Sequence, residues 1–194
     1  MNNRAIGIFD SGVGGLSCVK ELLCCVPNED IKYLGDTLRM PYGVKTIEDL
    51  REFAKNNVAF LQRRDVKLVA AACGTVSSNV TREDMDNLCV PFVDVIHPTV
   101  TAALYASKSR RIGIIATPAT VSAKSIEARL KAQDSRVQVI SVGCPRFVPL
   151  IEEGHIYDEE IAAAAREYLA PIKGFGVDTL ILGCTHYPII SKII

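Results

Sequence analysis

Two cysteines of this 194-residue chain stand in matching surroundings and have the chemistry of a proton-transfer pair. Cys73 ends the apolar run VKLVAAAC, Cys184 ends TLILGC, and a threonine follows each cysteine within two positions. If one thiolate removes a proton from a carbon while an opposing thiol delivers a proton to the other face, the configuration of that carbon is inverted. The pair therefore predicts a two-base site with one sulfur on each side of a small ligand.

An internal repeat explains why these two cysteines correspond. The segment RAIGIFDSGVGGLSCVKELL resembles RRIGIIATPATVSAKSIEARL, and the cysteine-terminated runs recur at nearly the same offset. Such a pattern is typical of a duplicated α/β unit, whose two pseudo-symmetric lobes face a shared cleft at the carboxyl ends of their strands. We expect both thiols at these ends, each with its pKa lowered by a helix N-terminus.

The cysteines and histidines also allow other interpretations. A single free cysteine is often only a buried packing residue, but the matched positions of Cys73 and Cys184 favour catalysis. The other five have no counterpart in the repeat and are predicted to pack: Cys18, Cys24, Cys25, Cys89 and Cys144. A thiol redox protein is disfavoured because no C-x-x-C pair is present. The three histidines are scattered away from other zinc ligands, so we predict no metal site.

Polar residues near the predicted strand ends suit a small amino acid as ligand. Asp10 is placed to hold an ammonium group or to orient a thiol, and His186 to polarise a carboxylate or assist proton transfer, although a lone histidine is as often structural. Tyr42 and Gly43 lie in a proline-initiated turn, which is either a cleft wall or only a turn. Hydroxyl groups that would donate to a carboxylate come from Ser11, Thr75, Thr117, Thr120 and Thr185.

The glycine-rich segment IGIFDSGVGGL, residues 6–16, raises the question of a phosphate site. Its glycines do not follow the spacing of a dinucleotide fingerprint or of a P-loop. The carboxylate of Asp10 would also repel a phosphate in a partly desolvated cleft. The segment therefore disfavours a nucleotide and leaves another ligand to be found.

Strand-like runs alternate with helix-like stretches along the whole chain. The runs are AIGIF, DIKYLG, VKLVAAAC, VPFVDVI, RRIGIIA, VQVISV and TLILGC, and the helical stretches are 15–23, 46–63, 122–132 and 158–169. This alternation predicts an α/β fold with mostly parallel sheets. We expect two lobes, residues 1–97 and 98–194.

Composition and charge exclude several classes of protein. Lys plus Arg and Asp plus Glu number 22 each, so no overall field attracts nucleic acid or an acidic membrane surface. The start of the chain lacks a signal sequence, and no apolar run approaches the thickness of a bilayer. Seven cysteines without a regular framework suit a reducing compartment. We therefore expect a cytoplasmic protein.

Six segments together carry a family resemblance: IGIFDSGVGGL, YLGDTLRMPYG, AACGTVSS, IGIIATPATV, FVPLIEEG and LILGCTHYP. In this order and over nearly the whole chain they resemble the glutamate racemases, cofactor-independent enzymes of the Asp/Glu racemase family that supply D-glutamate for bacterial peptidoglycan. The resemblance implies that no cofactor is needed, that Cys73 acts on D-glutamate and that Cys184 acts on L-glutamate. It also implies that the substrate is lined by Asp10–Ser11, Tyr42–Gly43, Gly74–Thr75 and Thr185–His186, with Asp10, Glu152 and His186 assisting the thiols.

Two departures from the family pattern lead to further expectations. Gly74 stands where the family has asparagine, which removes an amide contact to substrate and predicts a looser turn and weaker turnover. The sequence also stops at SKII, soon after the second cysteine, which suggests truncation, lower stability than full-length relatives and self-association as a homodimer. Two alternatives stay open: a racemase of aspartate or another amino acid, and a homologue that binds glutamate without efficient turnover.

Overall fold

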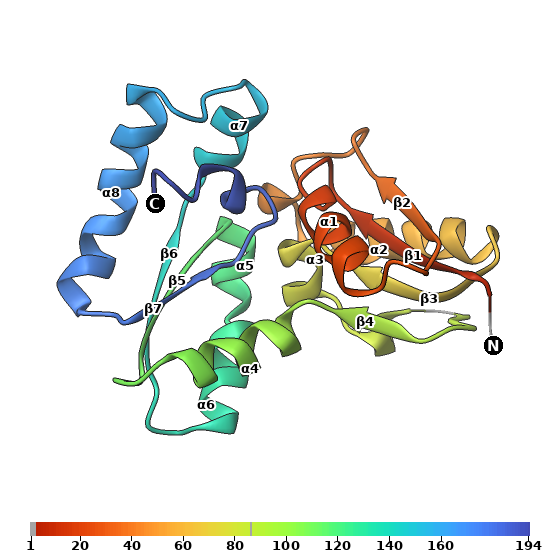
Figure 1. Cartoon of the computed structure of the whole chain (residues 1–194), viewed down its shortest axis with the longest axis horizontal. Helices are drawn as coiled ribbons and strands as arrows, with labels where there is room; N and C mark the ends of the chain where they lie inside the picture. Colours follow the sequence, from red (N-terminus) through yellow and green to blue (C-terminus); the bar gives the residue numbers. More distant parts are fainter. Residues whose placement is uncertain (1–2, 86) are drawn as a thin grey trace.

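Parallel strands form two separate sheets in the computed structural model, which describes residues 3–85 and 87–194 (Figure 1). The first sheet has the order β2-β1-β3-β4, with strands β1 (Ala5–Asp10), β2 (Ile31–Gly35), β3 (Val66–Ala71) and β4 (Phe92–Asp94). The second has the order β6-β5-β7, with strands β5 (Arg111–Ala116), β6 (Gln138–Gly143) and β7 (Thr179–Leu182). The predicted α/β fold with parallel sheets is confirmed.

The two sheets repeat one arrangement of strands. β1 lies between β2 and β3 just as β5 lies between β6 and β7, and every one of these pairs is parallel. Cys73 and Cys184 each stand two residues beyond the equivalent strands β3 and β7. The elements from β1 to β4 are called the first lobe below, and those from α4 to the last described residue the second lobe. A boundary after residue 97 falls inside the first turn of α4 (Ile96–Ala106) and stays a prediction.

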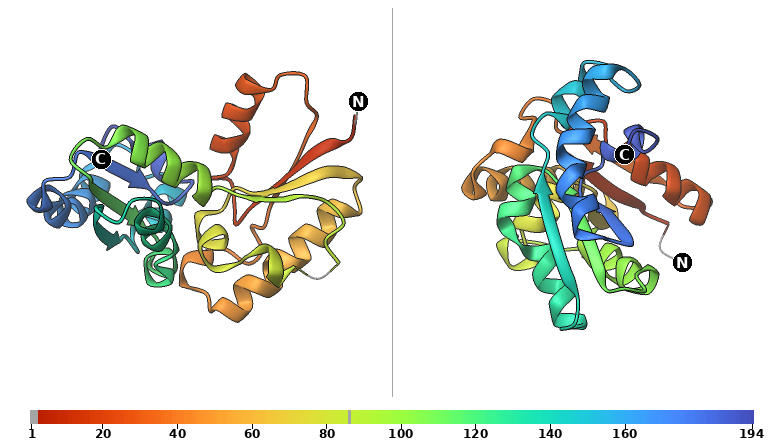
Figure 2. Two further views of the ribbon diagram at one scale, coloured as in Figure 1. Left: turned by 90° about the horizontal axis from the view of Figure 1, so that it is seen from below. Right: turned by 90° about the vertical axis from the view of Figure 1, so that its left-hand side faces the viewer.

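Helices cover both faces of the first sheet (Figure 2). One face packs on α2 (Ile47–Gln62) and α3 (Gly74–Asn79), with Phe9 of β1 fully buried between them. The other face packs on α1 (Leu16–Cys25) through Ile6 and Ile8. None of the ten described residues of α1 is fully buried, so this layer is thinner than the one formed by α2.

The second sheet is likewise a middle layer. Ile112 and Ile114 of β5 point to α4 and α6 (Ser125–Gln133), and Ile115 points to α7 (Phe147–Glu152), α8 (Glu159–Phe175) and the 3₁₀ turn η3 (Tyr187–Ile190). This in-and-out alternation follows from the two-residue period of a strand. The helix α5 (Pro118–Ala123) begins where β5 ends, beside the first lobe.

Local sequence signals account for some of the helix boundaries. Thr46 and Asp49 form a capping box at the start of α2, and Asp158 accepts two backbone N–H bonds at the start of α8. The predicted helix 122–132 is divided in the structure, because Lys124 has a positive φ of 53° and separates α5 from α6. The sequence analysis predicted no helical stretch for α4 and α7, and for α3 only a helix start after Cys73.

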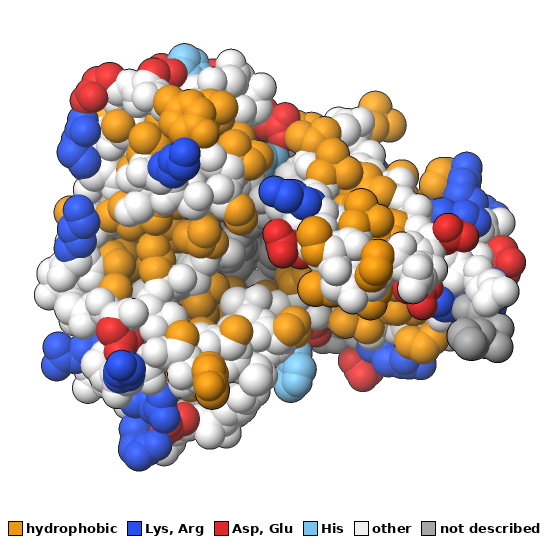
Figure 3. Space-filling model, viewed as in Figure 1, with side chains coloured by type: hydrophobic (Ala, Val, Ile, Leu, Met, Phe, Trp, Pro, Cys, Tyr) orange, Lys and Arg blue, Asp and Glu red, His pale blue; other side chains and the backbone are white. Residues whose placement is uncertain are grey.

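The remaining elements are the short 3₁₀ turns η1 (Tyr42–Val44) and η2 (Arg82–Asp84). The surface of the molecule is hollowed where the two lobes meet. Figure 3 shows the hollow between the lobes with hydrophobic side chains on both of its sides. Of the helices in the described ranges, none combines the length and apolar character needed to cross a bilayer.

Candidate active site

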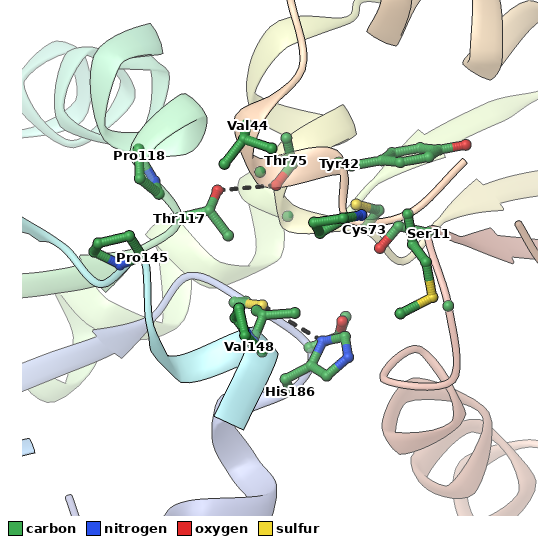
Figure 4. Close-up of a pocket in the computed structure, with 18 of the residues that line it drawn as sticks. Ser11, Tyr42, Val44, Cys73, Thr75, Thr117, Pro118, Pro145, Val148 and His186 are labelled. Atoms are coloured by element: carbon green, nitrogen blue, oxygen red, sulfur yellow. Dashed lines mark hydrogen bonds between the residues drawn. The ribbon is translucent and has the colours of Figure 1, made fainter. Parts of the chain in front are cut away.

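A cavity lies between the carboxyl ends of the strands of the two lobes (Figure 4). Its volume is about 60 Å³. The residues predicted from the sequence that line it are Ser11, Tyr42, Gly43, Cys73, Gly74, Thr75, Thr117, Cys184, Thr185 and His186.

The other three predicted residues stand behind this lining, and each is bonded to it. Asp10 accepts from the backbone N–H of Gly12, Thr120 exchanges a hydrogen bond with Thr117, and Glu152 contacts the ring of His186. The structure thus brings the whole predicted set to one place. Their individual roles remain proposals.

The glycine-rich segment after β1 holds a carboxylate of the chain itself. Asp10 is fully buried and accepts N–H bonds from Gly15 at 2.9 Å and from Gly12 at 3.3 Å. The hydroxyl of Thr185, from the second lobe, donates to both carboxylate oxygens at 3.4 Å. Burial raises the pKa of Asp10, while these N–H groups and the nearby His186 oppose the rise. The N–H groups that would bind a phosphate are therefore already occupied, in agreement with the sequence analysis.

Cys73 caps the N-terminus of α3 and is 4% exposed. Burial, followed by the negative charge of Asp10, raises the pKa of this thiol to about 12, although the backbone N–H groups of Val76, Ser11 and Thr75 act in the opposite direction. The lowered pKa expected from the helix terminus is therefore wrong for this form of the protein. Removal of the sulfur from water outweighs the helix dipole.

Cys184 has an imidazole and a carboxylate behind it. Its Sγ lies 3.7 Å from Nδ1 of His186 (Figure 4). Nε2 of His186 lies 2.6 Å from Oε1 of Glu152. Because an ionised carboxylate can only accept, Nε2 carries the proton and Nδ1 is left to accept from the thiol. Burial raises the pKa of Cys184 well above that of a free thiol, so here too the expected lowering is wrong.

Threonine hydroxyls connect the lobes at the inner end of the cavity. Thr75 Oγ1 of the first lobe lies 3.0 Å from Thr117 Oγ1 of the second (Figure 4). Thr117 Oγ1 in turn lies 3.0 Å from Thr120 Oγ1. Each hydroxyl can both donate and accept. The three hydrogen-bonded hydroxyls can therefore reorient their O–H protons toward a carboxylate that enters the cavity.

The hydroxyl of Tyr42 does not face the cavity, because it is bonded elsewhere. The ring is buried in the core of the first lobe, where the hydroxyl donates to Asp36 and accepts from Asn57 at 3.1 Å. Arg39 binds the same Asp36 carboxylate at 2.6 Å. The network anchors the turn that carries Gly43, so the cleft-wall interpretation of Tyr42 and Gly43 is the one the structure supports.

Sequence reasoning missed most of the apolar lining, which consists of Met40, Pro41, Val44, Pro118, Cys144, Pro145, Val148 and Pro149. Cys144 had been predicted only to pack. It stands directly after β6, so the rule that strand ends meet at one edge would have placed it here. Among the lining residues that the structure describes, none is a lysine or an arginine. A carboxylate in this cavity would be held by neutral donors. Across the described ranges, no three His, Cys, Asp or Glu side chains are grouped to hold a metal ion.

Comparison with known proteins shows the family of this chain. The family profile described as Asp/Glu/Hydantoin racemase matches residues 16–194. The chain belongs to the Asp/Glu/hydantoin racemase family. A glutamate racemase from Geobacter metallireducens is 42% identical over 98% of this chain and 71% of its own length.

Solved structures from this racemase family share the fold. A glutamate racemase isoform from Bacillus anthracis superposes with a TM-score of 0.95 at 34% identity and covers 100% of this chain and 73% of its own. The glutamate racemase from Francisella tularensis, solved in complex with D-glutamate, superposes with a TM-score of 0.91 at 38% identity and the same coverage. The pseudo-symmetric pair of parallel sheets is thus the architecture of the racemase family.

Proposed function

We propose that this chain interconverts L-glutamate and D-glutamate by proton transfer at the α-carbon, with Cys73 and Cys184 as the two bases and no cofactor. The observation that carries the proposal is the placement of both thiols, each two residues beyond an equivalent strand, in the lining of one cavity between the lobes. The relatives named glutamate racemase supply the substrate. In a bacterium, the D-glutamate formed would enter peptidoglycan.

The residues around the cavity suggest how the substrate is held. The negative end of the site at Asp10 favours the ammonium group, through the hydroxyl of Thr185 that bonds to it. The carboxylates then fall to neutral donors, namely the hydroxyls of Ser11, Thr75 and Thr117 and backbone N–H groups such as that of Gly43. An ammonium cation inside the cavity also lowers the free energy of a nearby thiolate, which offsets the effect of burial on the two cysteines.

The proton transfers balance in each direction. With D-glutamate, the Cys73 thiolate takes the α-proton, the electron pair remains on the α-carbon, and the Cys184 thiol donates its proton to the opposite face. With L-glutamate the roles are exchanged, as the family resemblance implies. His186 would then accept the proton of Cys184 on Nδ1, with Glu152 stabilising the imidazolium that forms.

The deciding experiment follows the α-proton of each enantiomer in D₂O by NMR and the ratio of the two enantiomers by circular dichroism. We expect both enantiomers to exchange and to converge on a racemate, and aspartate to react more slowly under the same conditions. Binding of glutamate without exchange would contradict the proposal and support a glutamate-binding homologue. Faster turnover of aspartate would assign a different substrate to the same chemistry.

The location and assembly of the protein are part of the same proposal. A cytoplasmic enzyme would meet the free amino acid, and it would keep its thiols reduced. We also propose a homodimer, which light scattering coupled to size-exclusion chromatography would test. A monomer at micromolar concentration would contradict this assignment without affecting the proton-transfer chemistry.

A further inference from the structure

The turn that carries Cys73 touches the second lobe through a residue without a side chain. Gly74 is the buried first residue of α3. A Cβ atom at this position would lie 3.1 Å from the carbonyl carbon of Gly183, closer still to its oxygen, and 3.7 Å from Cα of Cys184. Protein interiors do not tolerate such an overlap without movement of the backbone. The two turns that carry the thiols are therefore in direct backbone contact.

Other bonds fix α3 in this position. Thr75 shares its hydroxyl with Thr117 at 3.0 Å, and the Asn79 amide donates to the carbonyl of Ala119 at 3.4 Å, both across the lobes. A side chain at residue 74 could not be accommodated by tilting α3 away from the second lobe unless these bonds were broken. Strain introduced at this residue would pass to the separation of the lobes.

Gly43 makes a second contact of the same kind at the cavity. A Cβ atom there would lie 2.7 Å from Cβ and 2.9 Å from Cγ2 of Thr117. These are atoms close to the backbone of a β-branched side chain, which cannot swing aside freely. The first lobe thus meets the second through glycine at two separate turns.

We propose that Gly74, supported by Gly43, is a positioning residue that sets the separation of the Cys73 and Cys184 sulfur atoms across the cavity. The inference rests on the proposed function, because it concerns the geometry of the same proton transfers. Inversion requires both sulfurs within reach of one carbon, and a displacement of about 1 Å can reduce a rate about 100-fold. In this chain, the glycine that the sequence predicts to loosen the turn allows the two thiol turns to approach this closely.

The kinetic test compares Gly74→Ala with Gly174→Ala, a matched control in α8 whose added Cβ would meet nothing within 4 Å. We expect kcat of Gly74→Ala to fall about 30- to 100-fold with KM changed less than about threefold, and Gly174→Ala to match the wild type. The ratio of α-deuterium exchange to racemisation should rise in Gly74→Ala, because exchange needs one thiol whereas inversion needs both. A variant that is only destabilised would lose both rates together and keep the ratio.

A second measurement does not depend on activity. Without substrate, alkylation of Cys73 by iodoacetamide, quantified on its peptide by mass spectrometry, should be at least about fivefold faster in Gly74→Ala because a wedge between the lobes exposes the sulfur. If the wild type fails to exchange either enantiomer, the proposed function is wrong, while the alkylation rates still decide whether Gly74 closes the lobes.

Wild-type values of kcat, of the exchange ratio and of the alkylation rate in Gly74→Ala would overturn the inference. Wild-type values of the same three quantities in Gly74→Asn would also overturn it. This variant restores the family residue and should here act as a larger wedge. If circular dichroism shows that Gly74→Ala does not fold, Gly43→Ala applies the same test at the other contact. A folded Gly43→Ala with the wild-type exchange ratio and Cys73 alkylation rate would likewise overturn it.

Discussion

The two thiol turns occupy equivalent places in the two lobes but stabilise charge in different ways. The sulfur of Cys73 faces backbone N–H groups at the start of α3, including those of Thr75 and Val76. Cys184 has the His186–Glu152 pair within reach of its sulfur. The duplicated strands have thus kept the positions of the bases, whereas the groups that serve each base have diverged. Under the proposed function, the two bases would therefore be served by different groups.

The largest expected effect comes from removing either base. Cys73→Ser and Cys184→Ser should each reduce racemisation at least about 1,000-fold, because a serine hydroxyl is a far weaker acid than a thiol and inversion needs both groups. The double variant should be little worse than either single one, since residues that act as a unit are not additive. The measurement is circular dichroism from each enantiomer. Wild-type rates in either single variant would remove the basis of the comparison.

Replacement of the His186 imidazole should distinguish the roles of the two thiols. His186→Asn is expected to lower kcat about 100-fold by removing the proton acceptor of Cys184. The equilibrium constant of a racemisation is 1, so kcat/KM must fall equally for both enantiomers. The asymmetry should instead appear in the isotope effect of α-deuterated substrate, which should rise for L-glutamate and fall for D-glutamate. Equal changes for both enantiomers would show that His186 does not serve one thiol alone.

The pH dependence of Cys73 tests the other half of the comparison. Because burial raises the pKa of this thiol to about 12, its thiolate fraction in the ligand-free protein should still be growing above pH 9. Alkylation of Cys73 is therefore expected to accelerate about tenfold between pH 9 and 10, where an unperturbed cysteine of pKa about 8.5 is already mostly ionised. A plateau near pH 9 would mean that the helix N-terminus prevails over burial. Bound glutamate should move the profile to lower pH.

The smallest effect is expected at the carboxylate behind the imidazole. Glu152→Gln keeps an oxygen that accepts from Nε2 of His186 but removes the charge that stabilises the imidazolium, so kcat should fall about fivefold. The isotope effects should shift in the same directions as for His186→Asn, only less. An isotope pattern opposite to that of His186→Asn would place Glu152 outside this relay.

Patterns of residues were enough to predict the strands and the meeting of Cys73 with Cys184, because both follow from strand periodicity and from the repeat. The helices α3 and α7 were not predictable in the same way. They are six residues each, too short for a helical period to show. In α4 the proline at residue 98 breaks the usual signal, although a proline is tolerated in the first turn of a helix.

Properties that depend on burial lay beyond sequence reasoning. The pKa of Cys73 is raised because residues distant in the chain remove its sulfur from water. The helix N-terminus that the sequence indicates after Cys73 would by itself lower this pKa. The hydroxyl of Tyr42 is held away from the cavity by its hydrogen bonds to Asp36 and Asn57. No local sequence motif indicates these contacts. The close approach of Gly74 to Gly183 exists only once the lobes are assembled.

The carboxylate of Asp10 inside the glycine-rich turn gives the cleft a fixed polarity. Two backbone N–H groups that would attract anions from solution are saturated by a charge built into the strand itself. The turn therefore has no free N–H of Gly12 or Gly15 to bind an anion and instead holds a partly screened carboxylate behind the lining of the cavity. Under the proposed function, the ammonium group of the substrate would be drawn to this end of the cavity, which would orient the molecule before any bond to hydrogen is broken.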